Sequence, residues 1–237
     1  MKTLNISTRL LSEAVWRRIF DNAAPRYMQK RQSFFDLMAS LDLLRKGAEY
    51  NTGSISTSSA WALYSVAGLF QPEKVLEVGT FIGKSTMAIA TGMHDSGLQN
   101  GILHTCDLSN AIELPNTTNV KITQHKKTSS TEMFRQIQLS HNNKHQFQFI
   151  HLDGRLQNDD IPILAKICST DIVIALDDFE GFEKGTFNFA NMQAANILTD
   201  HILIYPPSEA LLRDFGFVDH STTALLLHKN TIDFTPQ

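Results

Sequence analysis

The chain lacks several features that mark specialised proteins. Its 237 residues include only two cysteines, Cys106 and Cys168, which lie in or beside apolar segments without metal-like spacing, so we expect buried thiols in a reducing cytoplasm. No apolar run approaches the roughly 18 residues that a membrane span needs, and residues 1–11 lack the apolar stretch and cleavage site of a signal peptide. The formal net charge of −3 provides no basic footprint for nucleic acid. We therefore expect a cytoplasmic protein with no nucleic-acid or membrane partner.

The first 70 residues have the spacing of helices. Apolar residues recur at helical intervals around Val15 and again around Leu41, and Pro25 is predicted to separate these two helices. A third helix is predicted from Ser56 or Thr57 until Pro72 stops it. We expect residues 1–70 to form an N-terminal helical cap, which covers a substrate or forms a homodimer contact. Residues 71–237 are expected to form one compact domain.

From residue 74 onward, apolar strands alternate with helices. Strands are predicted at 74–78, 101–106, 120–125, 147–152, 171–176, 201–205 and 224–228, and helices at 85–93, 128–140, 160–168, 185–198 and 208–214. This alternation predicts an α/β fold with a seven-stranded, mostly parallel sheet and helices on both faces. The last two strands are joined by a short segment that ends in Gly216-Phe217-Val218, which suits an antiparallel edge strand. Ligands of such sheets bind beyond the carboxyl ends of the strands, so the residues just after each strand carry the functional information.

The first strand leads into a turn with two glycines, Gly79 and Gly83, and then into a helix. A phosphate-binding loop needs four residues between its first glycine and the Gly-Lys pair, but only three are present here. A dinucleotide-binding turn needs glycine at the position of Phe81. Neither pattern fits, which leaves an ordinary strand-to-helix turn or a turn for another nucleotide-like ligand.

The sequence Leu-Glu-Val-Gly-Thr-Phe-Ile-Gly-Lys-Ser at this turn resembles motif I of class I S-adenosylmethionine-dependent methyltransferases, in particular the small-molecule O-methyltransferases. The resemblance implies a Rossmann-like fold with S-adenosylmethionine as cofactor. Close backbone approach at the glycines, and donors at the helix N-terminus, suit the methionine part of that cofactor. The cofactor-binding candidates in this turn are Glu77, Gly79, Thr80, Gly83 and Ser85.

Asp107 follows the second predicted strand, some 24 positions after Gly83. An acid at about this distance from a glycine turn is placed to hold a ribose diol, and the resemblance implies the same role. The alternative is that Asp107 caps the turn that follows it.

Three further acids follow the fourth and fifth predicted strands. Asp153 ends the fourth strand, while Asp177 and Asp178 end the fifth, so all three are expected at one rim of the sheet. Converging carboxylates repel one another unless a cation intervenes, and a hard divalent ion such as Mg²⁺ suits oxygen ligands. The run Leu-Asp-Gly followed by Asp-Asp-Phe is similar to metal-dependent O-methyltransferases acting on sugars and natural products. That resemblance implies that these three acids are metal ligands. Asp153 is also a candidate for contact with the cofactor.

Arg155 departs from the pattern, because those families commonly carry an acid or histidine just after the Asp-Gly pair. An arginine cannot accept a proton at neutral pH, but it can neutralise carboxylates or clamp an acidic substrate. The catalytic candidates are therefore Asp153, Arg155 and Asp178.

Together these patterns predict methyl transfer from S-adenosylmethionine to a small-molecule acceptor, most simply a hydroxyl of a natural product or sugar. The alternatives are a metal-independent methyltransferase acting on an amine, carbon or carboxylate, with Arg155 gripping the substrate, a phosphate-loop nucleotide-binding protein, and a cofactor-binding module without catalysis.

Overall fold

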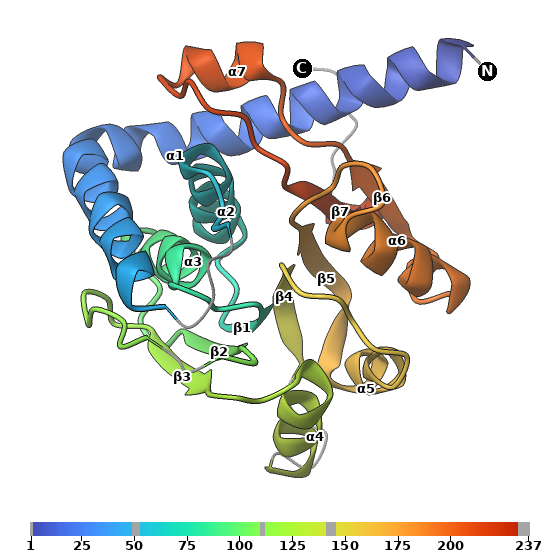
Figure 1. Cartoon of the computed structure of the whole chain (residues 1–237). Helices are drawn as coiled ribbons and strands as arrows, with labels where there is room; N and C mark the ends of the chain where they lie inside the picture. Colours follow the sequence, from blue (N-terminus) through green and yellow to red (C-terminus); the bar gives the residue numbers. More distant parts are fainter. Residues whose placement is uncertain (1, 49–52, 110–111, 141–145, 232–237) are drawn as a thin grey trace.

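The computed structural model describes residues 2–48, 53–109, 112–140 and 146–231. A seven-stranded sheet runs through the molecule in the order β3-β2-β1-β4-β5-β7-β6, and strands β1 to β5 are parallel (Figure 1). The strands are β1 (Lys74–Val78), β2 (Ile102–Cys106), β3 (Lys121–His125), β4 (Phe147–Leu152), β5 (Cys168–Leu176), β6 (His201–Ile204) and β7 (Ala224–His228). The helices are α1 (Lys2–Leu44), α2 (Thr57–Phe70), α3 (Lys84–Asp95), α4 (Ser130–Ser140), α5 (Asp160–Ile167), α6 (Lys184–Ala194) and α7 (Glu209–Asp214). The predicted Rossmann-like α/β class is confirmed.

Helices cover both faces of the sheet. One apolar core joins α1, α2, α3 and α7 to the face that carries Val75 and Phe149. The other core joins α4, α5 and α6 to the face that carries Leu76 and Ile150. Since side chains alternate between the faces of a strand, each buried strand supplies both cores.

The predicted antiparallel edge strand is confirmed, because β6 forms the edge of the sheet and pairs antiparallel with β7. The final strand, β7, lies inside the sheet between β5 and β6. The physical reason is burial: residues 224–227 of β7 are all buried, whereas only Ile204 of β6 is. A continuous apolar strand needs cover on both faces, which an inner position provides.

The prediction that Pro25 separates two helices was wrong. Helix α1 continues through Pro25 and turns about halfway along its length (Figure 1). A proline removes one helical hydrogen bond and commonly kinks a helix without ending it when packing holds both halves. Phe20 before the proline and Tyr27 after it are both buried, and both contact Trp61 of α2.

Helix α2 begins where the sequence predicted. The Ser56 hydroxyl accepts a hydrogen bond of 3.0 Å from the backbone N–H of Ser59, and the helix ends before Pro72. Both cysteines are free thiols, with Cys106 buried and Cys168 only partly buried. Within the described ranges, no helix is both long and apolar enough to cross a membrane.

Candidate functional site

The carboxyl ends of β1, β2, β4 and β5 are held together by backbone hydrogen bonds. Gly79 N–H donates to the Cys106 carbonyl at 2.9 Å, and Asp153 N–H donates to the Val78 carbonyl, also at 2.9 Å. Asp177 N–H then donates to the Leu152 carbonyl at 3.1 Å. The residues after these strands therefore meet at one edge of the sheet, as the sequence predicted.

The glycine turn depends on both of its glycines. Gly79 has a φ of 103°, and a Cβ there would lie 3.1 Å from the backbone of Asp153. Gly83 has a φ of 79°, and a Cβ there would meet Leu114 at 2.1 Å. Side chains are disfavoured by both φ and space at these positions. The turn is therefore packed tightly against β4 and the loop after β2.

Glu77 lies beneath this turn and has no exposed surface. Its carboxylate accepts a hydrogen bond from the Thr86 hydroxyl and lies 3.1 Å from Nδ1 of His151, its neighbour on β4. Burial opposes a charge on His151, but the hydrogen bond and charge of Glu77 outweigh it and raise the pKa of His151. This pair was not predicted from the sequence, although the pairing of β1 with β4 places the two side chains side by side.

A first cavity of about 340 Å³ lies beyond the ends of β1, β2 and β4. Its lining includes Gly79, Asp107 and Asp153 from the predicted cofactor-binding set, together with Leu108. Leu108 is 71% exposed and supplies an apolar part of the wall. An apolar wall, a glycine backbone and a carboxylate fit the purine and ribose of a nucleoside.

Asp107 already holds the loops around this cavity. One carboxylate oxygen accepts a 2.8 Å hydrogen bond from the Phe81 N–H, and the other accepts from the N–H and hydroxyl of Ser109 at 2.8 and 2.6 Å. The turn-capping alternative is thus seen in the structure. Carboxylate oxygens have further lone pairs, so binding of a ribose by Asp107 stays a prediction.

The other predicted cofactor-binding residues lie below the cavity surface. Thr80 and Ser85 are buried, and the Thr80 hydroxyl bonds that of Thr105. Lys84, which would bind phosphate in a phosphate loop, is also buried and pairs with Asp42 of α1 at 3.1 Å. This placement argues against the phosphate-loop alternative, because the ammonium is engaged inside the protein.

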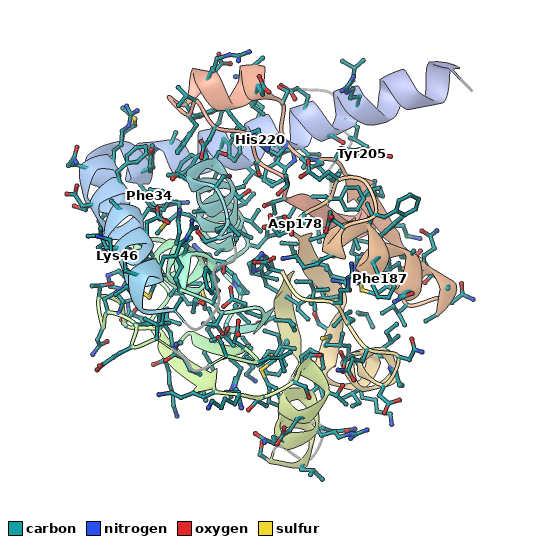
Figure 2. All side chains as sticks on the ribbon, in the orientation of Figure 1. Phe34, Lys46, Asp178, Phe187, Tyr205 and His220 are labelled. Carbon is teal, nitrogen blue, oxygen red and sulfur yellow. The ribbon has the colours of Figure 1, made fainter. Side chains whose placement is uncertain are left out.

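A second cavity of about 340 Å³ adjoins the first, and Asp153 lines both. Asp177 and Asp178 line the second cavity, so the structure brings the three predicted acids together. His220, which is exposed, and Lys184 also line it, and Asp178 and His220 are labelled in Figure 2. Neither His220 nor Lys184 was among the predicted site residues.

Lys184, rather than Arg155, is the positively charged residue that contacts the acids at the ends of β4 and β5. Its ammonium contacts the carboxylates of Asp153 and, at 2.9 Å, Asp178. Burial and the nearby charge of Asp177 raise the pKa of Asp153 to about 7, against the lowering effect of Lys184. Among the residues that the structure describes, no group of three histidine, cysteine, aspartate or glutamate side chains is arranged to hold a metal ion. The arrangement therefore does not fit the ligand set implied by the resemblance.

Arg155 is exposed and lines the first cavity. Its guanidinium lies 5.6 Å from the centre of the Phe187 ring on α6, a cation–π distance. No ion pair of Arg155 occurs among the contacts of the described residues. A catalytic role for Arg155 stays a prediction.

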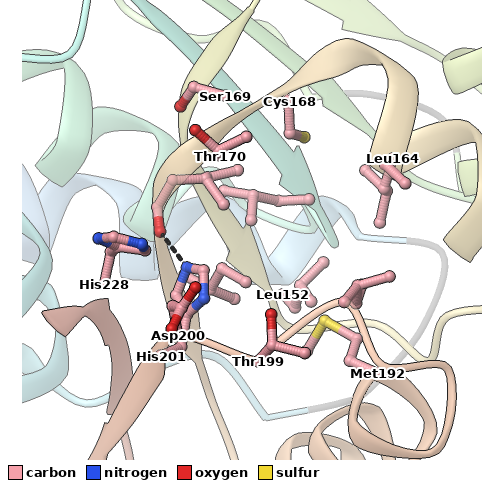
Figure 3. A pocket seen from close by; sticks show the side chains of 15 residues that line it. Leu152, Leu164, Cys168, Ser169, Thr170, Met192, Thr199, Asp200, His201 and His228 are labelled. Carbon is pink, nitrogen blue, oxygen red and sulfur yellow. Dashed lines mark hydrogen bonds between the residues drawn. The ribbon is translucent and has the colours of Figure 1, made fainter.

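A further cavity of about 280 Å³ opens at the opposite edge of the sheet, where β5 and β6 begin (Figure 3). His201 Nε2 lies 3.0 Å from the Ile172 carbonyl, to which it donates, and burial lowers the pKa of His201. None of the predicted site residues lines this cavity. The two cavities at the carboxyl ends therefore form the candidate site.

Comparison with known proteins gives the class of fold. No protein-family model and no curated protein matches the sequence. Solved structures do match, and O-methyltransferases are among them, which confirms the predicted resemblance at the level of the fold.

Three of these structures illustrate the likeness. TomG of Streptomyces achromogenes, an O-methyltransferase of tomaymycin synthesis solved with S-adenosylmethionine, superposes with a TM-score of 0.56 at 14% identity, over 81% of this chain and 89% of TomG. An O-methyltransferase of Bacillus cereus, solved with S-adenosylhomocysteine, gives the same four values. CalS11, the TDP-rhamnose 3′-O-methyltransferase of calicheamicin biosynthesis, superposes with a TM-score of 0.51 at 10% identity, over 81% of this chain and 93% of CalS11.

Proposed function

We propose that this protein is an S-adenosylmethionine-dependent methyltransferase that methylates an oxygen of a small molecule. The observation that carries the proposal is the shared position of Asp153, which lines both cavities at the carboxyl ends of the strands. A transferase must bring a donor and an acceptor within reacting distance. Two adjoining cavities with one carboxylate at their junction supply that arrangement.

The first cavity is proposed to hold the cofactor. Asp107 is placed to accept hydrogen bonds from the ribose hydroxyls, and the exposed side chain of Leu108 can cover one face of the adenine. Gly79 lets the backbone approach the ligand closely. The remaining predicted cofactor-binding residues are proposed to fix the shape of the turn, in place of the direct contacts predicted for them. These residues are Glu77, Thr80, Gly83 and Ser85.

The second cavity is proposed to hold the acceptor. Ser54, Ser56 and His220 supply polar groups to its wall, which suits a hydroxylated molecule. S-Adenosylmethionine supplies a methyl group that is already activated on a sulfonium. The chain must orient the acceptor and remove its proton, and Asp153, with its pKa raised to about 7, is the base placed to do so.

The class of acceptor is proposed from the likeness to TomG and CalS11, which are named for a natural product and a sugar nucleotide. The polar wall of the second cavity is consistent with a sugar or natural-product hydroxyl. An amine, carbon or carboxylate acceptor is the alternative, and a panel of acceptors with isotope-labelled S-adenosylmethionine distinguishes them by the product formed. Cofactor binding without turnover on the whole panel would favour the inactive binding module.

Calorimetric titration tests the cofactor part of the proposal. We expect S-adenosylhomocysteine to bind the purified protein, and Asp107→Ala to weaken binding by about 1–3 kcal/mol, or roughly 5- to 150-fold. Asp171→Ala, at an exposed acid within β5, is the matched control and should bind normally. Binding of ATP without any binding of S-adenosylhomocysteine would overturn the proposal.

A further inference from the structure

Lys184, on helix α6, contacts acidic residues at the carboxyl ends of two neighbouring strands. It is the first residue of α6, and its ammonium contacts Asp153 at the end of β4 and Asp178 at the end of β5. Its side chain is 31% exposed, compared with 16% for Asp153 and 35% for Asp178. The cation therefore sits between two carboxylates at the wall of the proposed acceptor cavity.

The third acid, Asp177, accepts hydrogen bonds from hydroxyl groups and has no contact with a cation among the described residues. Its side chain is almost fully buried, and one of its oxygens accepts hydrogen bonds from the hydroxyls of Thr222 and Thr223 at 3.2 and 2.9 Å. These hydroxyls belong to the segment that leads into β7. Asp177 is thus directed toward β7, while Asp153 and Asp178 share Lys184.

The charges favour a lysine that stays protonated. Burial opposes the charge of Lys184, but the two carboxylates outweigh it and raise its pKa above the ordinary value. A divalent ion entering this position would have to displace the ammonium from both carboxylates. It would also lie close to a positive charge that remains tethered nearby, which costs electrostatic free energy.

We propose that the Lys184 ammonium takes the position of the divalent cation, so that this protein needs no metal. The inference rests on the proposed function and deepens it. An ammonium has three donors, and two of them serve Asp153 and Asp178. The third is available to the acceptor oxygen in the cavity. Lys184 thus bridges the two acids and donates directly to the acceptor oxygen.

Titration with Mn²⁺, followed by the electron paramagnetic resonance signal of the free ion, tests this proposal on the full chain. The wild-type protein should show no stoichiometric site with a dissociation constant below about 10⁻³ M. Lys184→Met frees two carboxylates and should gain one Mn²⁺ site that binds about tenfold more tightly than any site of the wild type. Lys166→Met, at an exposed lysine of α5, is the matched control and should gain none.

Two results would overturn the proposal. One is a single Mn²⁺ site in the wild-type protein that Asp178→Asn weakens. A metal would then bind beside Asp178 although Lys184 is present. The other is a folded Lys184→Met variant that gains no Mn²⁺ site. Circular dichroism checks folding, and the wild-type titration decides the question alone if the variant does not fold. Binding of S-adenosylhomocysteine is measured separately, so failure of the cofactor proposal is distinguishable from failure of this one.

Discussion

The buried pair of Glu77 and His151 gives a sharp prediction about stability. The two side chains have no exposed surface and face each other across β1 and β4. Glu77→Gln keeps the size of the side chain, so it creates no cavity, but it removes the charge that stabilises the imidazolium. Breaking a buried ion pair on one side costs about 3–5 kcal/mol. We expect about 3 kcal/mol, the low end, because His151 can relieve part of the cost by losing its proton.

That loss converts to a measurable shift. A chain of this size changes its Tm by about 2–4 °C per kcal/mol, so Glu77→Gln should lower Tm by about 6–12 °C. Thermal and urea unfolding followed by circular dichroism measure the change. His151→Leu combined with Glu77→Gln should be less destabilising than the sum of the single variants, by about 0.5–3 kcal/mol. Additive single effects, or a Tm shift below about 2 °C, would refute the ion-pair argument.

The pH dependence of this pair has a definite sign. Because the pKa of His151 is raised in the folded protein, the folded state binds the proton more tightly than the unfolded state. The resulting stabilisation is fully present below the pKa of an unfolded histidine and is lost as pH rises through the folded pKa. The Tm difference between the wild type and Glu77→Gln should therefore be larger at about pH 6 than at about pH 10. A difference independent of pH would show that His151 is neutral throughout.

Two further predictions follow from other ionisable groups. Because the pKa of Asp153 is raised in the folded protein, the stabilisation contributed by its protonated form is lost as pH rises from about 4 toward 7. Asp153→Asn lacks this loss, so its Tm relative to the wild type should rise between those pH values. Parallel Tm curves of the two proteins would contradict the shift. Asp42→Ala leaves the buried Lys84 ammonium without its partner and should lower the free energy of unfolding in urea by about 1–3 kcal/mol. The control Asp36→Ala, at an exposed site of the same helix, should lower it by about 0–0.5 kcal/mol. Equal losses of unfolding free energy in the two variants would argue against the Lys84 contact.

The sheet and the residues at its edge could be predicted because both depend on local patterns. Apolar runs marked the strands, and β1, β4 and β7 have the predicted limits. Acids that follow parallel strands must meet at the carboxyl edge, which is why Asp153, Asp177 and Asp178 line one cavity. Boundaries were less accurate where apolar patterns faded: β5 begins at Cys168 instead of 171, and α6 ends at Ala194 instead of 198.

The features that could not be predicted have a common physical cause, which is packing between distant segments. Pro25 lies within α1 because residues on both sides of it pack into one core with α2. The inner position of β7 is set by its partners β5 and β6, and neither pairing can be read from the strand itself. Local propensity favours a break at proline, but the burial of large aromatic side chains outweighs it here.

Lys184 shows where pattern-based prediction of the site reaches its limit. In sequence it follows a polar loop after β5 and resembles a solvated residue, and its contact with Asp153 joins positions 31 residues apart. Which side chain neutralises a group of acids depends on which one can reach them from the surrounding elements. The same residue types therefore permit a metal, Arg155 or Lys184 in that role, and in the structure it is Lys184 of α6 that contacts Asp153 and Asp178.

Asp153 lies between the proposed cofactor cavity and the proposed acceptor cavity. Its backbone is packed so closely against the glycine turn that a Cβ at Gly79 would lie 3.1 Å away, while its carboxylate is held by Lys184 of α6. A ligand that shifted the turn would therefore press on the backbone of Asp153. Because Asp153 also lines the second cavity, the residue proposed as the base borders both of the proposed ligand sites. The proposed reaction therefore requires the glycine turn and the Asp153 carboxylate to keep their relative positions.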